Sequence, residues 1–186
     1  MGHLYVALLH HPVYDKNGAI VTTAVTNMDV HDLSRLARAF DVQASYIATP
    51  VPTLRRLVQR IIRHWDTGPG GSYNQTRKEA LALARLAPDL DAVVADVERE
   101  TGSLPRLVAT SAREGGPRLS FADLRRRLRE DARPELLCLG TGWGLAEEVL
   151  RRADDVLEPI LGTAGWNHLS VRTAAAIILD RLRSDR

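Results

Sequence analysis

The sequence predicts an α/β fold with a mostly parallel sheet covered by helices on both faces. Short apolar runs of strand length alternate with segments of helical periodicity, which is typical of βαβ units. Of the 186 residues, 45% are apolar and 26% are charged. This length and composition suit a single globular domain spanning residues 1–186.

The first elements follow from two apolar runs that predict buried strands at 3–9 and 44–49. Between them we expect a helix that Asp29 can cap. Its apolar side chains recur at helical spacing: Leu33, Leu36, Ala37 and Phe40.

A second helix is predicted from Leu54 to Trp65, directly after Pro50 and Pro52. Its apolar residues follow one helical stripe: Leu54, Leu57, Val58, Ile61, Ile62 and Trp65. The segment 66–75 is rich in glycine and polar residues, so we expect an exposed mobile loop and a candidate substrate lid.

The remaining chain continues the alternation of strands and helices. Residues 81–87 fit a strand or the end of a helix, and the helix at 90–100 is closed by Gly102. Further strands are predicted at 106–110, 135–139 and 156–160, and further helices at 121–130 and 171–182. Ser120 and Asp123 resemble a capping box at the start of the first of these helices.

The net charge of +2 does not by itself indicate a nucleic-acid partner. The arginines nevertheless gather in two stripes that could face phosphates. A solvated helix face would explain such charge runs equally well. The first stripe is Arg55, Arg56, Arg60 and Arg63, and the second is Arg118, Arg125, Arg126, Arg127, Arg129 and Arg133.

The single cysteine, Cys138, lies in an apolar run and is expected to be a buried, inert thiol. The amino-terminal run is too short for a signal peptide, and no run reaches the length of a membrane span. We therefore expect a cytoplasmic protein without membrane contact. The histidines show no metal-ligand spacing, so we also expect no metal.

The segment 136–145 predicts a ligand site, because a buried strand runs directly into the glycine-rich turn Gly140-Thr141-Gly142-Trp143-Gly144. Such a turn could be a dinucleotide-binding loop or the first motif of a Rossmann-like methyltransferase. It could also be only a tight turn between a strand and a helix. In both nucleotide folds the glycine loop follows the first strand. Here fewer than 50 residues follow Gly140, so a different topology is required.

From Leu136 to Leu182 the sequence resembles the C-terminal signature of the SPOUT (α/β-knot) methyltransferases. The resemblance is nearest to the ribose 2′-O-methylating branch and to a smaller bacterial subfamily of RNA methyltransferases. It is carried by Leu-Gly-Thr-Gly-Trp-Gly-Leu at 139–145, Glu-Glu-Val-Leu at 147–150, Asp-Val-Leu-Glu-Pro-Ile at 155–160, Asn-His-Leu-Ser-Val-Arg at 167–172, and Thr-Ser-Ala-Arg at 110–113.

The resemblance implies a C-terminal trefoil knot, a homodimer, S-adenosylmethionine as cofactor, and tRNA or rRNA as substrate. The methyl acceptor would be a ribose hydroxyl or a base atom. The implied cofactor pocket is formed by three loops and comprises Thr110, Ser111, Leu139, Gly140, Thr141, Gly142, Gly144, Ile160, Gly162, Leu169 and Ser170.

The first family motif, Asn-x-Gly-x-x-x-Arg, falls on Asp29, His31 and Arg35, where only the arginine matches. We expect Arg35 to favour a developing oxyanion or to orient the RNA backbone. Asp29 is a candidate general base, although carboxylates at helix starts are commonly structural. Ser170 stands where the ribose-methylating branch has asparagine.

Two alternatives stay open at this point. One is a non-catalytic, knotted RNA-binding or scaffold protein, which the departures in the first motif would suit. The other is an oxidoreductase that uses the turn at Gly140 to bind a dinucleotide.

Overall fold

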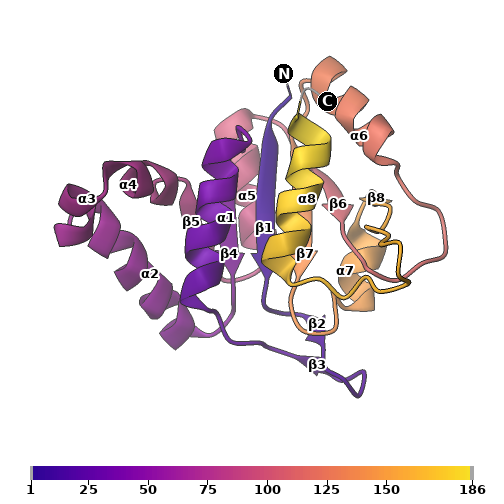
Figure 1. The fold of residues 1–186 in the computed structure, drawn as a ribbon, viewed down its shortest axis with the longest axis horizontal. Coiled ribbons are helices and arrows are strands. Elements are labelled where there is room, and N and C mark those ends of the chain that lie inside the picture. The colour runs from indigo at the N-terminus through magenta and orange to yellow at the C-terminus, as the bar shows by residue number, and fades with distance from the viewer. Residues whose placement is uncertain (1, 185–186) are drawn as a thin grey trace.

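The computed structural model describes residues 2–184 and contains a six-stranded, entirely parallel sheet (Figure 1). The strand order is β5-β4-β1-β7-β6-β8. The predicted parallel α/β fold is therefore confirmed. The strands are β1 (Leu4–Leu9), β4 (Ala44–Ala48), β5 (Ala84–Ala87), β6 (Arg106–Ala109), β7 (Glu135–Gly140) and β8 (Asp155–Val156).

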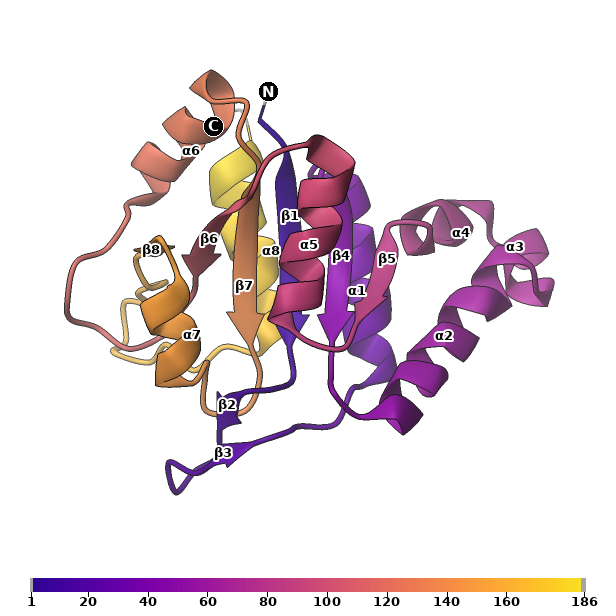
Figure 2. The same ribbon diagram turned by 180° about the vertical axis from the view of Figure 1, so that it is seen from behind.

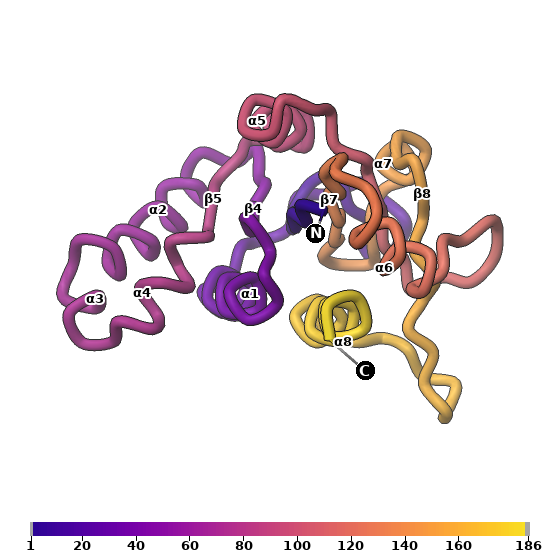
Figure 3. The backbone as a smooth tube through the Cα atoms, turned by 90° about the horizontal axis from the view of Figure 1, so that it is seen from above, coloured from indigo at the N-terminus to yellow at the C-terminus, as the bar shows by residue number. Residues whose placement is uncertain are grey.

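Helices cover both faces of the sheet (Figures 2 and 3). The alternating side chains of β1 divide the core: Leu4, Val6 and Leu8 enter one apolar cluster, and Tyr5, Ala7 and Leu9 enter the other. The first cluster includes residues of α1 (Asn27–Ala39), α6 (Phe121–Glu130) and α8 (Val171–Arg183), and the second includes residues of α5 (Leu90–Thr101) and α7 (Glu147–Arg152).

Three helices between β4 and β5 project sideways from the sheet, and we call residues 52–81 the arm (Figure 1). They are α2 (Pro52–Asp66), α3 (Pro69–Tyr73) and α4 (Gln75–Leu81). The predicted mobile loop at 66–75 is wrong, because residues 69–73 are helical and Gly70 and Gly71 are buried. A Cβ atom on Gly71 would lie 2.4 Å from the Trp65 carbonyl oxygen, so close packing explains these glycines.

Two smaller predictions are also corrected. Asp29 does not cap α1; Thr26 is the N-cap, and Asp29 is the third helical residue of the same capping box. The predicted strand at 156–160 is reduced to β8 and a single bridge between Leu157 and Leu119.

The sequence also missed a hairpin of β2 (Val13–Tyr14) and β3 (Ile20–Val21), which lies beyond the carboxyl ends of the strands (Figure 1). None of the helices within residues 2–184 has the length and apolarity needed to cross a membrane.

Candidate functional site

Three loops meet at the carboxyl edge of the sheet, where ligands of open α/β folds bind. The Thr110 hydroxyl, just after β6, donates to the Cys138 carbonyl oxygen in β7 at 3.0 Å. The Asn167 side-chain amide donates to the Ala112 carbonyl oxygen at 2.6 Å. The Asn167 contact joins loops 110–113 and 160–170, and the Thr110 contact places the first of them beside β7, which leads into loop 140–145.

The loop after β7 is a tight turn in which the Gly144 amide donates to the Thr141 carbonyl oxygen at 3.1 Å. Gly142 and Gly144 adopt φ angles of +59° and +101°, which favour glycine. A Cβ atom on Gly142 would lie 2.8 Å from the Tyr14 carbonyl oxygen. The conformation of the turn itself therefore requires glycine at these positions.

The hairpin β2–β3 holds this turn in place. The Trp143 amide donates to the Tyr14 carbonyl oxygen and the Tyr14 amide donates to the Gly144 carbonyl oxygen, both at 2.9 Å. The Asn17-Gly18 dipeptide between two short apolar pairs is a hairpin signal that could have revealed this element.

Beneath the turn lies a chain of polar side chains. The hydroxyls of Thr141 and Thr23 are 2.5 Å apart, and the Thr23 hydroxyl is 3.1 Å from Nδ1 of His10. His10 is fully buried, and burial lowers its pKa, although the charge of Asp29 opposes the shift. A neutral His10 can fix the Thr23 hydroxyl and, through it, the orientation of Thr141.

The third loop, 160–170, presents apolar side chains to solvent: Leu161 is 60% exposed and Trp166 is 68% exposed. Ser170 caps α8, because its hydroxyl accepts a hydrogen bond from the Thr173 amide at 3.3 Å. Apolar side chains beside backbone polar groups are what an adenosine-sized ligand requires. The three loops therefore fit S-adenosylmethionine.

The expected cofactor residues all lie on these loops or at the end of β7. The side chain of Leu139 belongs to the buried core, so only its backbone can reach a ligand. A cavity of about 730 Å³ lies instead at the opposite edge, beside His3, Tyr5 and Gln43. The sequence predicts the site at the loops instead, because the glycine turn lies at the carboxyl edge.

The two expected catalytic residues differ in their surroundings. Arg35 is exposed on α1, and its guanidinium makes no hydrogen bond or ion pair to another residue within 2–184. Asp29 is buried, and its carboxylate accepts hydrogen bonds from the amide and the hydroxyl of Thr26 at 3.1 and 2.6 Å. It also pairs with Arg172 of α8 at 2.9 Å. These contacts favour a structural role for Asp29 over a general base.

A parallel sheet with a late glycine turn at its carboxyl edge, followed by a C-terminal helix, agrees with the SPOUT class of methyltransferases that the sequence resembles. The chain belongs to the family of SAM-dependent RNA methyltransferases, which it matches over residues 3–184. This membership removes the dinucleotide-dependent oxidoreductase as an alternative.

The chain is similar to a tRNA (guanine-N(1)-)-methyltransferase of Oleidesulfovibrio alaskensis, with 46% identity over 183 residues. The match covers 98% of this chain and 42% of that relative, so the chain spans less than half of the relative's length. An uncharacterized protein of Aquifex aeolicus is 43% identical over 182 residues, which cover 98% of this chain and 89% of the relative.

Among solved structures, the fold is similar to the SpoU methyltransferase AviRb of Streptomyces viridochromogenes in complex with AdoMet. The TM-score is 0.57 and the identity is 18%, with 97% of this chain and 56% of that chain covered. This likeness confirms the fold.

Proposed function

We propose that this chain binds S-adenosylmethionine at the three loops and transfers a methyl group to a ribose hydroxyl or a base atom of tRNA or rRNA. The observation that carries the proposal is that loops 110–113 and 160–170 are joined at the carboxyl edge, beside the strand that leads into loop 140–145. Family membership supports both the cofactor and an RNA substrate. We treat residues 1–186 as one catalytic domain.

The chain's main task is alignment, because in-line attack on a methyl group requires donor and acceptor to be held in register. S-adenosylmethionine supplies that methyl group on a sulfonium. Backbone groups of the turn 140–144 hold the cofactor, and Leu161, Trp166 and Leu169 cover it against water. The small side chains of Ala174 and Ala175 allow α8 to lie close to the turn 140–144.

Arg35 is the proposed catalytic residue. Its free guanidinium can orient an RNA phosphate and favour negative charge that develops on an attacking oxygen. Asp29 instead positions the start of α1 through Thr26 and Arg172.

We further propose a homodimer in which Arg35 acts on the cofactor held by the partner. Met28 near the start of α1 is 56% exposed, and Leu169 just before α8 is 37% exposed. Burial of these side chains in an interface would favour association. Mixing Arg35→Ala with Gly142→Val protein tests the proposal. Mixed dimers should regain part of the activity that each parent lacks, whereas a monomer in sedimentation would contradict it.

A C-terminal trefoil knot is also proposed. Strand β8 lies at the edge of the sheet. After it the chain passes the loop 110–113, where Asn167 contacts Ala112. Helix α8 then packs between α1 and α6 (Figure 3). A crystal structure traced through residues 110–184 would establish or exclude the knot.

Cofactor binding tests the proposed function directly. S-adenosylmethionine should bind in calorimetry and raise the melting temperature, because it stabilises only the folded state. NADH serves as the control and should do neither. A chain that binds neither S-adenosylmethionine nor S-adenosylhomocysteine would contradict the proposal.

A further inference from the structure

The arm carries an excess of positive charge that the rest of the chain lacks. Residues 52–81 hold six of the 25 basic residues and two of the 23 acidic residues, a net charge of +4. Because the whole chain has a net charge of +2, the remainder has a net charge of −2. The positive field is therefore concentrated on the arm.

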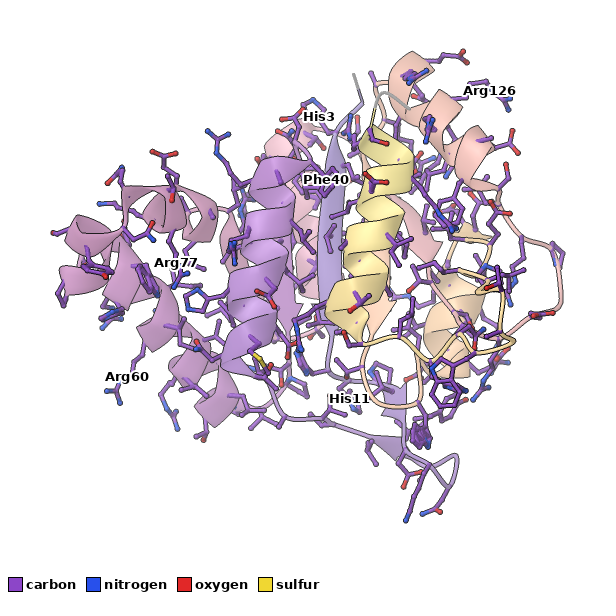
Figure 4. The ribbon with its side chains drawn as sticks, in the orientation of Figure 1. His3, His11, Phe40, Arg60, Arg77 and Arg126 are labelled. Atoms are coloured by element: carbon purple, nitrogen blue, oxygen red, sulfur yellow. The ribbon has the colours of Figure 1, made fainter. Side chains whose placement is uncertain are left out.

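Helix α2 presents this charge on its outer face. Its inner face is used in the core, where Val58 is fully buried and Ile61 packs against the same cluster. Arg56, Arg60 and Arg63 are exposed and lie about one helical turn apart. Figure 4 shows Arg60 pointing away from the body of the molecule. Among residues 2–184, no carboxylate pairs with any of these three arginines.

The arginines of α6 differ because several of them have partners within the fold. Arg127 pairs with Glu135 and Asp155, both of which lie in strands. Arg126 pairs with Asp123 at 2.6 Å, and Arg125 donates to the Arg181 carbonyl oxygen. Arg129 is exposed and its side chain has no partner among residues 2–184, so α6 keeps one free guanidinium, whereas all three exposed arginines of α2 lack a carboxylate partner. Of the two stripes seen in the sequence, the one on α2 therefore offers more unpaired charge to an external anion.

The arm is also fixed relative to the proposed catalytic helix. The ring of Trp65 in α2 packs edge-on against His31 of α1, with centroids 5.5 Å apart, and Arg77 lies 5.0 Å above the same ring. His31 is one helical turn from Arg35. A ligand held on α2 would therefore be held at a defined place relative to Arg35.

We propose that the outer face of α2, formed by Arg56, Arg60 and Arg63, docks the phosphate backbone of the RNA substrate. The inference rests on the proposed function and adds the surface that holds the RNA. A membrane does not suit this face, because a helix that lies on lipid must insert its apolar side, and most of that side packs against the core here. Tyr73, 90% exposed at the end of α3, offers an aromatic ring for an unpaired base.

The test compares two triple variants in binding to unfractionated transfer RNA at several salt concentrations. Arg56→Gln, Arg60→Gln and Arg63→Gln together should flatten the slope of log affinity against log salt by about 2 to 3. The matched control, Arg126→Gln, Arg129→Gln and Arg133→Gln, removes the same charge and should leave the slope nearly unchanged. Tyr73→Ala should weaken binding roughly tenfold without changing the slope.

Calorimetry with S-adenosylmethionine separates the two proposals. The arm variant should keep the cofactor affinity of the unaltered protein. The docking surface would be overturned if the salt slope were unchanged in the triple variant of α2, or if it flattened only in the control triple variant. Normal cofactor binding in the same experiment would leave the proposed function standing. If the unaltered protein did not bind S-adenosylmethionine, the proposed methyltransferase function would be overturned instead.

Discussion

Replacement of Gly142 by alanine tests the glycine turn most sharply. The residue has a φ angle of +59°, and a conformation of this kind costs an L-amino acid about 1–2 kcal/mol. The added Cβ atom would also lie 2.8 Å from the Tyr14 carbonyl oxygen, which accepts the hydrogen bond from the Trp143 amide. Weakening that bond adds about 1 kcal/mol.

The free energy of unfolding should therefore fall by about 2–3 kcal/mol. For a chain of this size the melting temperature should fall by roughly 4–12 °C. Displacement of the turn should also weaken binding of S-adenosylmethionine by about tenfold or more, which corresponds to about 1.4 kcal/mol. Thermal unfolding and calorimetric titration measure the two effects separately.

Gly102→Ala is the matched control. Gly102 ends α5 with a φ angle of +72°, and a Cβ atom there would meet nothing within 4 Å. This variant should lose only about 1–2 kcal/mol from the backbone conformation and keep its cofactor affinity. If Gly142→Ala costs no more than Gly102→Ala and binds the cofactor equally well, the turn is not part of the site.

Three further predictions concern buried polar groups. Because burial holds the pKa of His10 below its ordinary 6.5 in the folded chain, its contribution to stability is complete above that pH and is lost as the pH falls. His10→Gln should therefore flatten the decline in melting temperature between pH 7.5 and 5.0. A decline as steep as that of the unaltered protein would show that His10 does not cause it. Burial raises the pKa of the Cys138 thiol to about 12, so iodoacetamide should leave it unmodified in the native protein, and stoichiometric labelling would contradict this burial. Arg172→Gln leaves the buried carboxylate of Asp29 without its charged partner and should cost about 1–3 kcal/mol in denaturant unfolding. Adding Asp29→Asn should recover part of that loss, and strict additivity would argue against the pair.

The strands and most helices were predictable because their signals are local. The run Leu136 to Leu139 is buried as expected, and the turn at Gly140 follows it directly. The apolar stripe of α2 likewise predicted the face that packs on the core, except for Leu57, which is 45% exposed. In each case the residues that form the element also carry its pattern.

The errors arose where distant residues decide the structure. Gly70 and Gly71 look like loop residues by composition, but packing against His64 and Trp65 places them in a helix. Tyr14 joins the glycine turn through backbone hydrogen bonds to residues far along the chain, which leave no local pattern.

The two arginine stripes show the same limit for the candidate site. They look equivalent in the sequence, since both place basic residues along a helix. Their difference comes from acidic partners such as Glu135 and Asp155, which only the fold brings to Arg127. Asp29 is a similar case, because its pairing with Arg172 joins segments 143 residues apart.

Methyl transfer to RNA tests the central claim most directly. RNA from cells that lack the protein is incubated with the purified chain and S-adenosylmethionine, digested, and analysed for modified nucleosides by mass spectrometry. The proposed function predicts the appearance of a methylated nucleoside, and its loss with Arg35→Ala. The identity of the methylated nucleoside would show whether the acceptor is a ribose hydroxyl or a base atom. If the chain binds both S-adenosylmethionine and RNA yet no methylated nucleoside forms, the protein is an RNA-binding scaffold and the account is contradicted.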